Sequence, residues 1–317
     1  MPYQKGNGQS VVIALGGNAL GRTPQEQLDL VRGTAASIVD MVDDGMNLVV
    51  THGNGPQIGM ISDAFAAASE QDSDVPEMPF PECGAMSQGY IGYQLSQAIL
   101  NELRRRGIMR STASVLTQTV VYPDDPAFSH PTKPVGPFLT EERAHAKAAE
   151  TGAVFREDAG RGWRMVVASP LPRRIVEFDA IKDLADDGYV VVAAGGGGVP
   201  VIERDDSYFG VPAVVDKDLS SARLAADIKA DMLVILTAVD KVALRYGTPQ
   251  QVDLDRMSAA EARAYIDQGH FAPGSMLSKV QACLQFLQDR PGGTALITSL
   301  ERAQDGLRGR TGTLITA

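Results

Sequence analysis

Cysteine, tryptophan and long apolar stretches are scarce in this chain. Its 317 residues include one tryptophan and two cysteines, Cys83 and Cys283, too few for the disulfide framework of a small secreted protein. No apolar stretch approaches the roughly 18 residues that cross a bilayer. Residues 1–10 are polar, so we expect no signal sequence. These shortages predict a cytoplasmic protein without a membrane partner.

Positive charge is also in short supply. The chain has 29 Lys and Arg against 39 Asp and Glu, a formal net charge of −10. Excess negative charge repels nucleic acids and anionic membrane surfaces, so we expect neither as a partner. Any site for a small anion must then be a local feature.

Glycine is concentrated in three turns, each directly behind a short apolar stretch. Residues 11–15 lead into Gly16-Gly17-Asn18, residues 48–51 lead into His52-Gly53-Asn54-Gly55-Pro56, and residues 190–194 lead into Gly195-Gly196-Gly197-Gly198. Glycine brings backbone N–H groups close to a ligand, and a helix that opens after such a turn favours an anion. One such turn is ordinary in an α/β protein. Three together predict a site for phosphate or another small anion.

Strand and helix patterns alternate along most of the chain. This order predicts an α/β fold with an open, mainly parallel sheet sandwiched by helices. Besides the three strands above, we predict strands at 232–237, 295–298 and 313–315. The predicted helices span 25–44, 56–69, 87–106, 176–187, 218–228 and 275–288, and Ser258 and Glu261 form a capping box that opens one more.

Residues 120–167 break this alternation. The region holds five prolines, Pro123, Pro126, Pro131, Pro134 and Pro137, then a charged helix at 141–150 and candidate strands at 154–156 and 164–167. A structureless loop of this length is uncommon inside a compact domain. We therefore predict a small excursion with its own fold.

Three lysines supply candidate positive charge. Lys217 stands between Asp216 and Asp218, so we expect its neighbours to orient it. Lys279 lies in the first turns of a predicted helix, which suits phosphate neutralisation. Lys133 lies in the proline-rich region, where the alternative is an exposed lysine that touches only water. A kinase needs little beyond such positioning, Mg²⁺ and charge stabilisation.

Two other classes of function remain open from the residues. The spacing Gly53-x-Gly55-x-x-x-Gly59 is similar to a variant dinucleotide fingerprint, with Glu70 and Asp72 near the usual offset of about 20 residues for a ribose-binding acid. It follows the second strand, however, and does not open the fold. A dinucleotide-dependent oxidoreductase is one alternative, and a nucleotide-binding regulator without turnover is the other.

Nine longer motifs carry a resemblance that covers essentially the whole chain. They are LGGNAL (15–20), THGNGPQIG (51–59), AMSQGYIGYQL (85–95), HPTKPVGPF (130–138), SPLPRRIVE (169–177), AAGGGGVPVI (193–202), VDKDLSSA (215–222), LTAVDKV (236–242) and GSMLSKV (274–280). On these motifs the chain resembles the amino acid kinase family and, within it, the carbamate kinases.

The resemblance implies a fold, a reaction and partners. Residues 1–216 would form a lobe for carbamate or carbamoyl phosphate, with 120–167 as a protruding subdomain, and residues 217–317 would form a nucleotide-binding lobe. The implied reaction is reversible phosphoryl transfer between MgATP and carbamate, used to make ATP. Another activity of the family on a small carboxylate is the alternative. The implied partners are ATP or ADP with Mg²⁺, the carbamoyl substrates, and a second copy of the chain in a homodimer.

The resemblance also implies roles for individual residues. The catalytic set would be Lys217, Lys279, Asp216 and Asp218, where the two acids orient Lys217 or bind Mg²⁺, and no metal ligand is assigned further. The substrate-binding set would be Gly16, Gly17, Asn18, Gly53, Asn54, Gly55 and Lys133. The nucleotide-binding set would be Gly195, Gly196, Thr237, Val239, Asp240, Tyr246, Gly274, Ser275 and Met276.

One feature favours the carbamate kinases over other members of the family, and another departs from the family pattern. Acetylglutamate, aspartate and glutamate kinases place a lysine just ahead of the first glycine turn, where this chain has Ala14, so Lys217 and Lys279 would have to supply the missing charge. The family usually has Gly and Pro where this chain has Leu277 and Ser278, which removes a restraint on the backbone before Lys279. The four histidines, His52, His130, His145 and His270, are interpreted as structural or solvated.

Overall fold

The central element is an eight-stranded sheet. The computed structural model describes residues 8–16, 24–72, 74–158 and 160–317. The strand order is β15-β17-β16-β12-β1-β2-β9-β3, and all neighbours are parallel except β16 and β17. The strands are β1 (Ser10–Leu15), β2 (Asn47–His52), β3 (Thr112–Ser114), β9 (Val190–Val192), β12 (Met232–Thr237), β15 (Arg256–Ser258), β16 (Thr294–Ser299) and β17 (Thr313–Thr316). The predicted open, mainly parallel sheet is confirmed.

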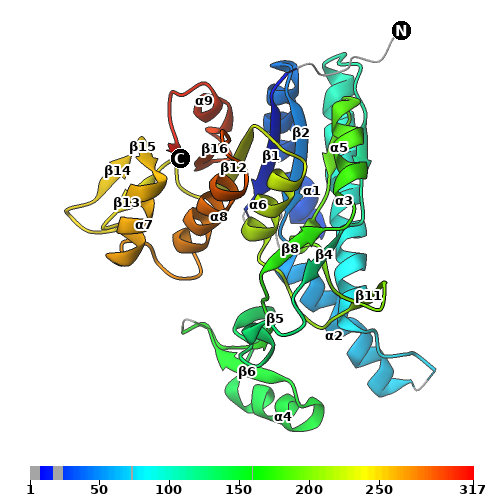
Figure 1. The fold of residues 1–317 in the computed structure, drawn as a ribbon. Coiled ribbons are helices and arrows are strands. Elements are labelled where there is room, and N and C mark those ends of the chain that lie inside the picture. The colour runs from blue at the N-terminus through cyan, green and yellow to red at the C-terminus, as the bar shows by residue number, and fades with distance from the viewer. Residues whose placement is uncertain (1–7, 17–23, 73, 159) are drawn as a thin grey trace.

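Helices cover both faces of this sheet (Figure 1). Alternate residues of β1 divide between two apolar clusters: Val11 and Ile13 pack with α1 (Pro24–Asp43) and α3 (Phe80–Arg105), whereas Val12 packs towards α6 and α8. These last two helices are α6 (Lys217–Asp227) and α8 (Met276–Asp289). Because β1 is buried on both faces, its sequence is a continuous apolar run, as parallel strands require.

Three further helices match predicted segments: α2 (Gly55–Gln71), α5 (Phe178–Asp186) and α7 (Ala259–Asp267). The short helix α9 (Ala303–Leu307) was not predicted. The capping box that opens α7 is confirmed at Ser258 and Glu261. Helix α3 begins at Phe80 and not near Ser87, because Pro81 suits the first helical turn and Gly84 is accommodated within the helix. Across the described ranges, no helix combines the length and apolar character of a membrane span.

A second sheet, which the alternation did not predict, has the order β11-β10-β4-β8. Its strands are β4 (Gln118–Val121), β8 (Pro172–Ile175), β10 (Val199–Arg204) and β11 (Ser207–Gly210). The third glycine turn forms a short 3₁₀ turn and then β10, so no helix opens there. A small hairpin of β13 (Val242–Leu244) and β14 (Val252–Leu254) completes the strands outside the protruding part.

The protruding part, which we call the arm, comprises residues 133–167. It has the antiparallel order β5-β7-β6, with β5 (Lys133–Leu139), β6 (Val154–Glu157) and β7 (Trp163–Val167), and the helix α4 (Glu141–Thr151). The helix and β6 and β7 match the predicted segments. Strand β5 was missed because its prolines argue against a strand, yet Pro134 pairs with Val166 at the sheet edge. Figure 1 shows the arm standing away from the main body beside α2.

Strand β2 ends in a buried histidine. His52 is 1% exposed, and its Nδ1 donates to the carbonyl oxygen of Gly53 at 2.8 Å. Burial lowers the pKa of His52 to about 4; the hydrogen bond to Gly53 opposes this and the charge of Lys217 adds to it. The ring is therefore neutral at neutral pH, which agrees with a structural role.

This burial predicts a pH-dependent stability. Unfolded His52 binds a proton near its usual pKa of 6.5, whereas folded His52 binds one only near 4, so stability is lost as the pH falls through this window. Between pH 7.5 and 5 the loss from this residue is about 2 kcal/mol. We expect His52→Gln to remove it, measured as urea unfolding at the two pH values. The exposed His130 provides the control, and an equal change for His130→Gln would contradict the assignment.

Candidate active site

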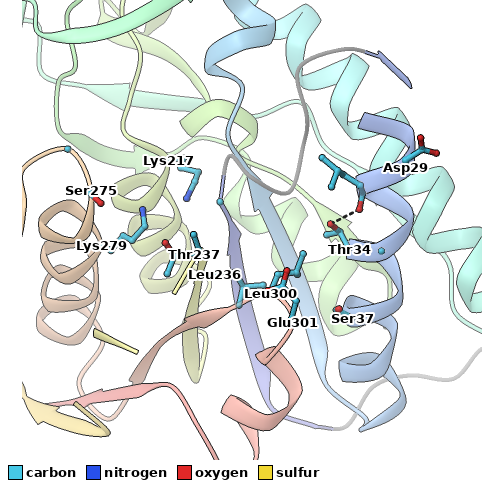
Figure 2. A pocket seen from close by; sticks show the side chains of 15 residues that line it. Asp29, Thr34, Ser37, Lys217, Leu236, Thr237, Ser275, Lys279, Leu300 and Glu301 are labelled. Carbon is cyan, nitrogen blue, oxygen red and sulfur yellow. Dashed lines mark hydrogen bonds between the residues drawn. The ribbon is translucent and has the colours of Figure 1, made fainter. Parts of the chain in front are cut away.

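A cavity of about 720 Å³ opens where the central strands end. Because β1, β2, β12 and β16 are parallel, their carboxyl ends share one edge of the sheet, where ligands bind in open α/β folds. Figure 2 shows helix α1 on one side of the cavity and Lys217 and Lys279 on the other. The lining residues are Gly16, Asp29, Leu30, Gly33, Thr34, Ser37, Lys217, Leu236, Thr237, Ala238, Gly274, Ser275, Lys279, Leu300 and Glu301.

The charge of the site is organised by one buried carboxylate. Asp218, in the first turn of α6, has a side chain that is 4% exposed and forms ion pairs with Lys217 and Lys279. The distance from Lys279 Nζ to Asp218 Oδ2 is 3.0 Å. Burial by itself would raise the pKa of Asp218, but the two ammonium groups outweigh it and lower the pKa to about 2. The cluster therefore carries a net charge of +1 at the cavity wall.

Asp216 has a different set of partners. It is the N-cap of α6, and its Oδ1 accepts the backbone N–H groups of Asp218 at 2.9 Å and Leu219 at 3.4 Å. Its Oδ2 accepts a hydrogen bond from Lys133 Nζ at 2.6 Å. The interpretation of Lys133 as a lysine that touches only water is therefore wrong. Lys133 connects the arm to the start of α6.

The second glycine turn faces the lysine cluster. A Cβ on Gly53 would lie 3.6 Å from Lys217 Cδ, so the turn and this lysine are in van der Waals range. The Asn54 side chain is buried and donates to Ser87 Oγ at 2.7 Å, which leaves its backbone as the part suited to a ligand. Helix α2 begins at Gly55, with Pro56 in its first turn. The positive end of the helix dipole favours an anion beside Lys217.

The third glycine turn packs behind the second. A Cβ on Gly195 would lie 2.5 Å from His52 Nε2, and a Cβ on Gly196 would lie 2.1 Å from Asn54 Nδ2. Neither glycine is among the residues that line the 720 Å³ cavity. The structure thus places both against the second turn, and their predicted contact with nucleotide stays a prediction.

The other predicted nucleotide residues divide into two groups. Thr237, Gly274 and Ser275 line the cavity, whereas Val239, Asp240, Tyr246 and Met276 do not. Asp240 accepts a hydrogen bond from Ser299 Oγ at 2.6 Å, and Tyr246 is 67% exposed. Gly17 and Asn18 lie outside the described residues.

Hydrogen bonds hold the turn before Lys279 together, although the proline of the family pattern is replaced by Ser278. Leu277 N–H donates to the carbonyl of Ala272 at 3.2 Å, and Ser278 Oγ donates to the carbonyl of Ser275 at 3.1 Å. Gly274 adopts φ = +69°, in the region that favours glycine. Helix α8 then starts at Met276 and directs Lys279 to Asp218.

Helix α1 forms one wall of the 720 Å³ cavity, which the sequence did not predict. Asp29, Thr34 and Ser37 line the cavity, and Thr34 Oγ1 donates to the carbonyl of Leu30 at 3.0 Å. Polar residues within an amphipathic helix are common, so the pattern carried no distinctive signal. No group of three or more His, Cys, Asp or Glu side chains suited to a metal ion occurs within the described part of the chain.

The chain is similar to known proteins over most of its length. A profile of the amino acid kinase family matches residues 9–298. The chain is 52% identical to a carbamate kinase of Staphylococcus haemolyticus over 96% of this chain and 98% of that protein. It is 50% identical to the carbamate kinase-like protein YqeA of Escherichia coli over 97% and 99% of the two chains.

A solved structure is also similar to this chain over nearly its whole length. The carbamate kinase of Giardia lamblia bound to AMP-PNP superposes with a TM-score of 0.90 and 42% identity, covering 98% of this chain and 99% of that one. The family match spans most of the chain, and the relatives match it nearly end to end. The chain belongs to the amino acid kinase family.

Proposed function

We propose that this chain is a carbamate kinase, which transfers a phosphoryl group between carbamoyl phosphate and MgADP. The observation that carries the proposal is the cluster of Lys217 and Lys279 on buried Asp218, at the wall of the cavity where the strands end. The similarity to carbamate kinases over nearly the whole chain supports the same conclusion. We propose ATP formation as the direction of use, in arginine metabolism and in the cytoplasm.

The proposed chemistry needs charge stabilisation rather than a base. The attacking oxygen is already anionic, on the terminal phosphate of ADP when ATP forms and on carbamate in the reverse reaction, so in-line transfer requires no proton abstraction. Lys217 and Lys279 neutralise the transferring phosphoryl group, and Asp218 fixes where both ammonium groups lie. The backbone N–H groups at Gly53, Asn54 and Gly55 hold the oxygens beside them. His52 is neutral and bonded to Gly53, which is consistent with a mechanism without a catalytic histidine.

Magnesium fits this site as part of the nucleotide substrate. Asp218 is committed to two lysines, and Asp216 to Lys133 and the helix cap. Mg²⁺ commonly keeps several waters and takes substrate phosphates with one or two carboxylates. We therefore propose that it enters as MgADP or MgATP, held mainly by phosphate oxygens, with the nucleotide in the 720 Å³ cavity.

We also propose a homodimer built from helices of the first lobe. Helix α3 exposes large side chains along its outer side, and Tyr93 is 61% and Met86 38% exposed. A second copy of the chain would cover this surface. Sedimentation equilibrium at micromolar concentration should give twice the monomer mass, and a monomer would refute the assembly.

A coupled assay tests the function directly. We expect the protein to form ATP from MgADP and carbamoyl phosphate, monitored through hexokinase and glucose-6-phosphate dehydrogenase. Acetyl phosphate in place of carbamoyl phosphate distinguishes the family alternative that uses another small carboxylate. Turnover with acetyl phosphate alone would favour that alternative, and binding of NADH without any ATP formation would favour a dinucleotide enzyme.

The two lysines of the cluster should be essential for turnover. Because β1 has Ala14 and no lysine, they supply the positive charge at the glycine turns. We expect Lys217→Ala and Lys279→Ala each to lower kcat by at least about 10²-fold, the effect of losing one strong electrostatic donor. Lys182→Ala, on the exposed side of α5, is the matched control. Near wild-type kcat in both folded cluster variants would contradict the mechanism.

Lys133 should act on one substrate more than on the other. It reaches Asp216 from the arm, which belongs to the proposed carbamoyl lobe. We expect Lys133→Ala to raise KM for carbamoyl phosphate much more than KM for ADP. The melting temperature should hardly change, because the side chain is 36% exposed and adds little packing. Equal changes in both KM values, or none, would leave Lys133 without this role.

A further inference from the structure

The arm touches helix α2 backbone against backbone. Gly59 lies one turn into α2, and Gly136 lies in the middle of β5. A Cβ on Gly59 would be 2.1 Å from Gly136 Cα and 2.4 Å from Gly136 N. Carbon atoms in contact normally stay about 3.5–4.0 Å apart. Any larger residue at position 59 would therefore push β5 away from α2 by more than about 1 Å.

The contact is packed only in part. Val135 is fully buried in an apolar cluster with Ile58, Cys83 and Val214. Val135 also lines a cavity of about 440 Å³, which lies between α2 and α4. Empty space of this size leaves room for the arm to tilt. The position of β5 is thus set at its contact with α2 and the adjacent cluster, and not by continuous packing along the arm.

The arm meets α2 again across the cavity through a weaker contact. Lys147 Nζ of α4 lies 3.7 Å from Asp63 Oδ1 of α2, and the two side chains are 34% and 42% exposed. Ion pairs with this exposure contribute little to stability. Burial raises the pKa of Asp63, and the charge of Lys147 only partly offsets this. The ion pair is therefore a poor candidate for fixing the arm.

Both elements that meet at the Gly59 contact, β5 and α2, lead to the candidate active site. Along β5, Lys133 precedes Gly136 by three residues, and its Nζ is 2.6 Å from Asp216 Oδ2. Along α2, the helix begins at Gly55, in the glycine turn that faces Lys217. One turn of helix therefore separates the proposed anion-binding turn from the residue against which the arm rests.

We propose that Gly59 and Gly136 are positioning residues that set where Lys133 lies. The inference rests on the proposed role of Lys133 in binding carbamoyl phosphate. With glycine at position 59, β5 lies directly on the first turn of α2, and Gly136 adopts φ = +72°, a backbone angle that favours glycine. Lys133 is thereby held at the distance that reaches Asp216 and the substrate. A displacement of about 1 Å in a substrate-positioning group costs as much as about 10²-fold in rate.

The test is Gly59→Ala, assayed for ATP formation with each substrate varied in turn. We expect KM for carbamoyl phosphate to rise by about tenfold or more, because Lys133 is displaced, and KM for ADP to stay within about twofold. In the Lys133→Ala background, Gly59→Ala should raise KM no further, because the side chain through which it acts is gone. An additional rise in the double variant would contradict the proposal.

Two control variants separate positioning from general damage. Ser69→Ala lies in the same helix as Gly59 but near the opposite end of that helix at Gln71; the Oγ of Ser69 donates to the carbonyl of Ala66 in α2, so both KM values should stay at wild type. Asp63→Asn weakens the ion pair, and it too should leave KM for carbamoyl phosphate unchanged. A rise with Asp63→Asn as large as that with Gly59→Ala would overturn the proposal.

The remaining outcomes are also decisive. Unchanged KM in folded Gly59→Ala, with an active wild type, overturns this inference alone. A wild type that forms no ATP overturns the proposed function instead. Failure of Gly59→Ala to fold contradicts the inference, because the arm and not the core should absorb the clash. Circular dichroism melting curves of all variants provide this check.

Discussion

The arrangement of the site depends on one buried carboxylate shared by two lysines. Moving three charged groups out of water is costly, and the pairing must compensate for that cost. Asp218 also lies in the first turn of α6, where the helix dipole favours a negative charge. A single anion between two cations leaves one positive charge over, directed at the cavity. That surplus charge makes the end of the sheet attractive to phosphate in a chain whose net charge is −10.

The fold brings these charges together from distant parts of the sequence. Helix α6 packs beside α8, so Lys217 and Lys279 meet at one carboxylate although 61 residues separate Asp218 from Lys279. Asp216 then joins the arm to the same helix start through Lys133. The three adjacent positions 216 to 218 thus serve as helix cap, cation and counter-ion. The close contact of Gly59 with Gly136 sets the distance over which the arm reaches this point.

The sequence predicted the central sheet because buried parallel strands such as β1 leave a continuous apolar run, and glycine marks where they end. The acids on either side of Lys217 marked this lysine as a candidate site residue, and the motifs carried the resemblance to a kinase family. The second sheet escaped prediction, since β10 follows a glycine turn that elsewhere opens a helix. Strand β5 was missed because proline is ordinarily depleted in strands. The different partners of Asp216 and Asp218 depend on packing between distant elements, which no local pattern encodes.

We infer that Asp218 holds both lysines in the position that phosphoryl transfer needs. The most direct measurement is kcat of Asp218→Asn for ATP formation, at a temperature where circular dichroism shows the variant folded. The side chains are nearly equal in size, so the change removes the charge and keeps the shape. We expect kcat to fall by at least about 10²-fold, because both ammonium groups lose the carboxylate that fixes their positions. A folded Asp218→Asn protein with kcat close to wild type would contradict it.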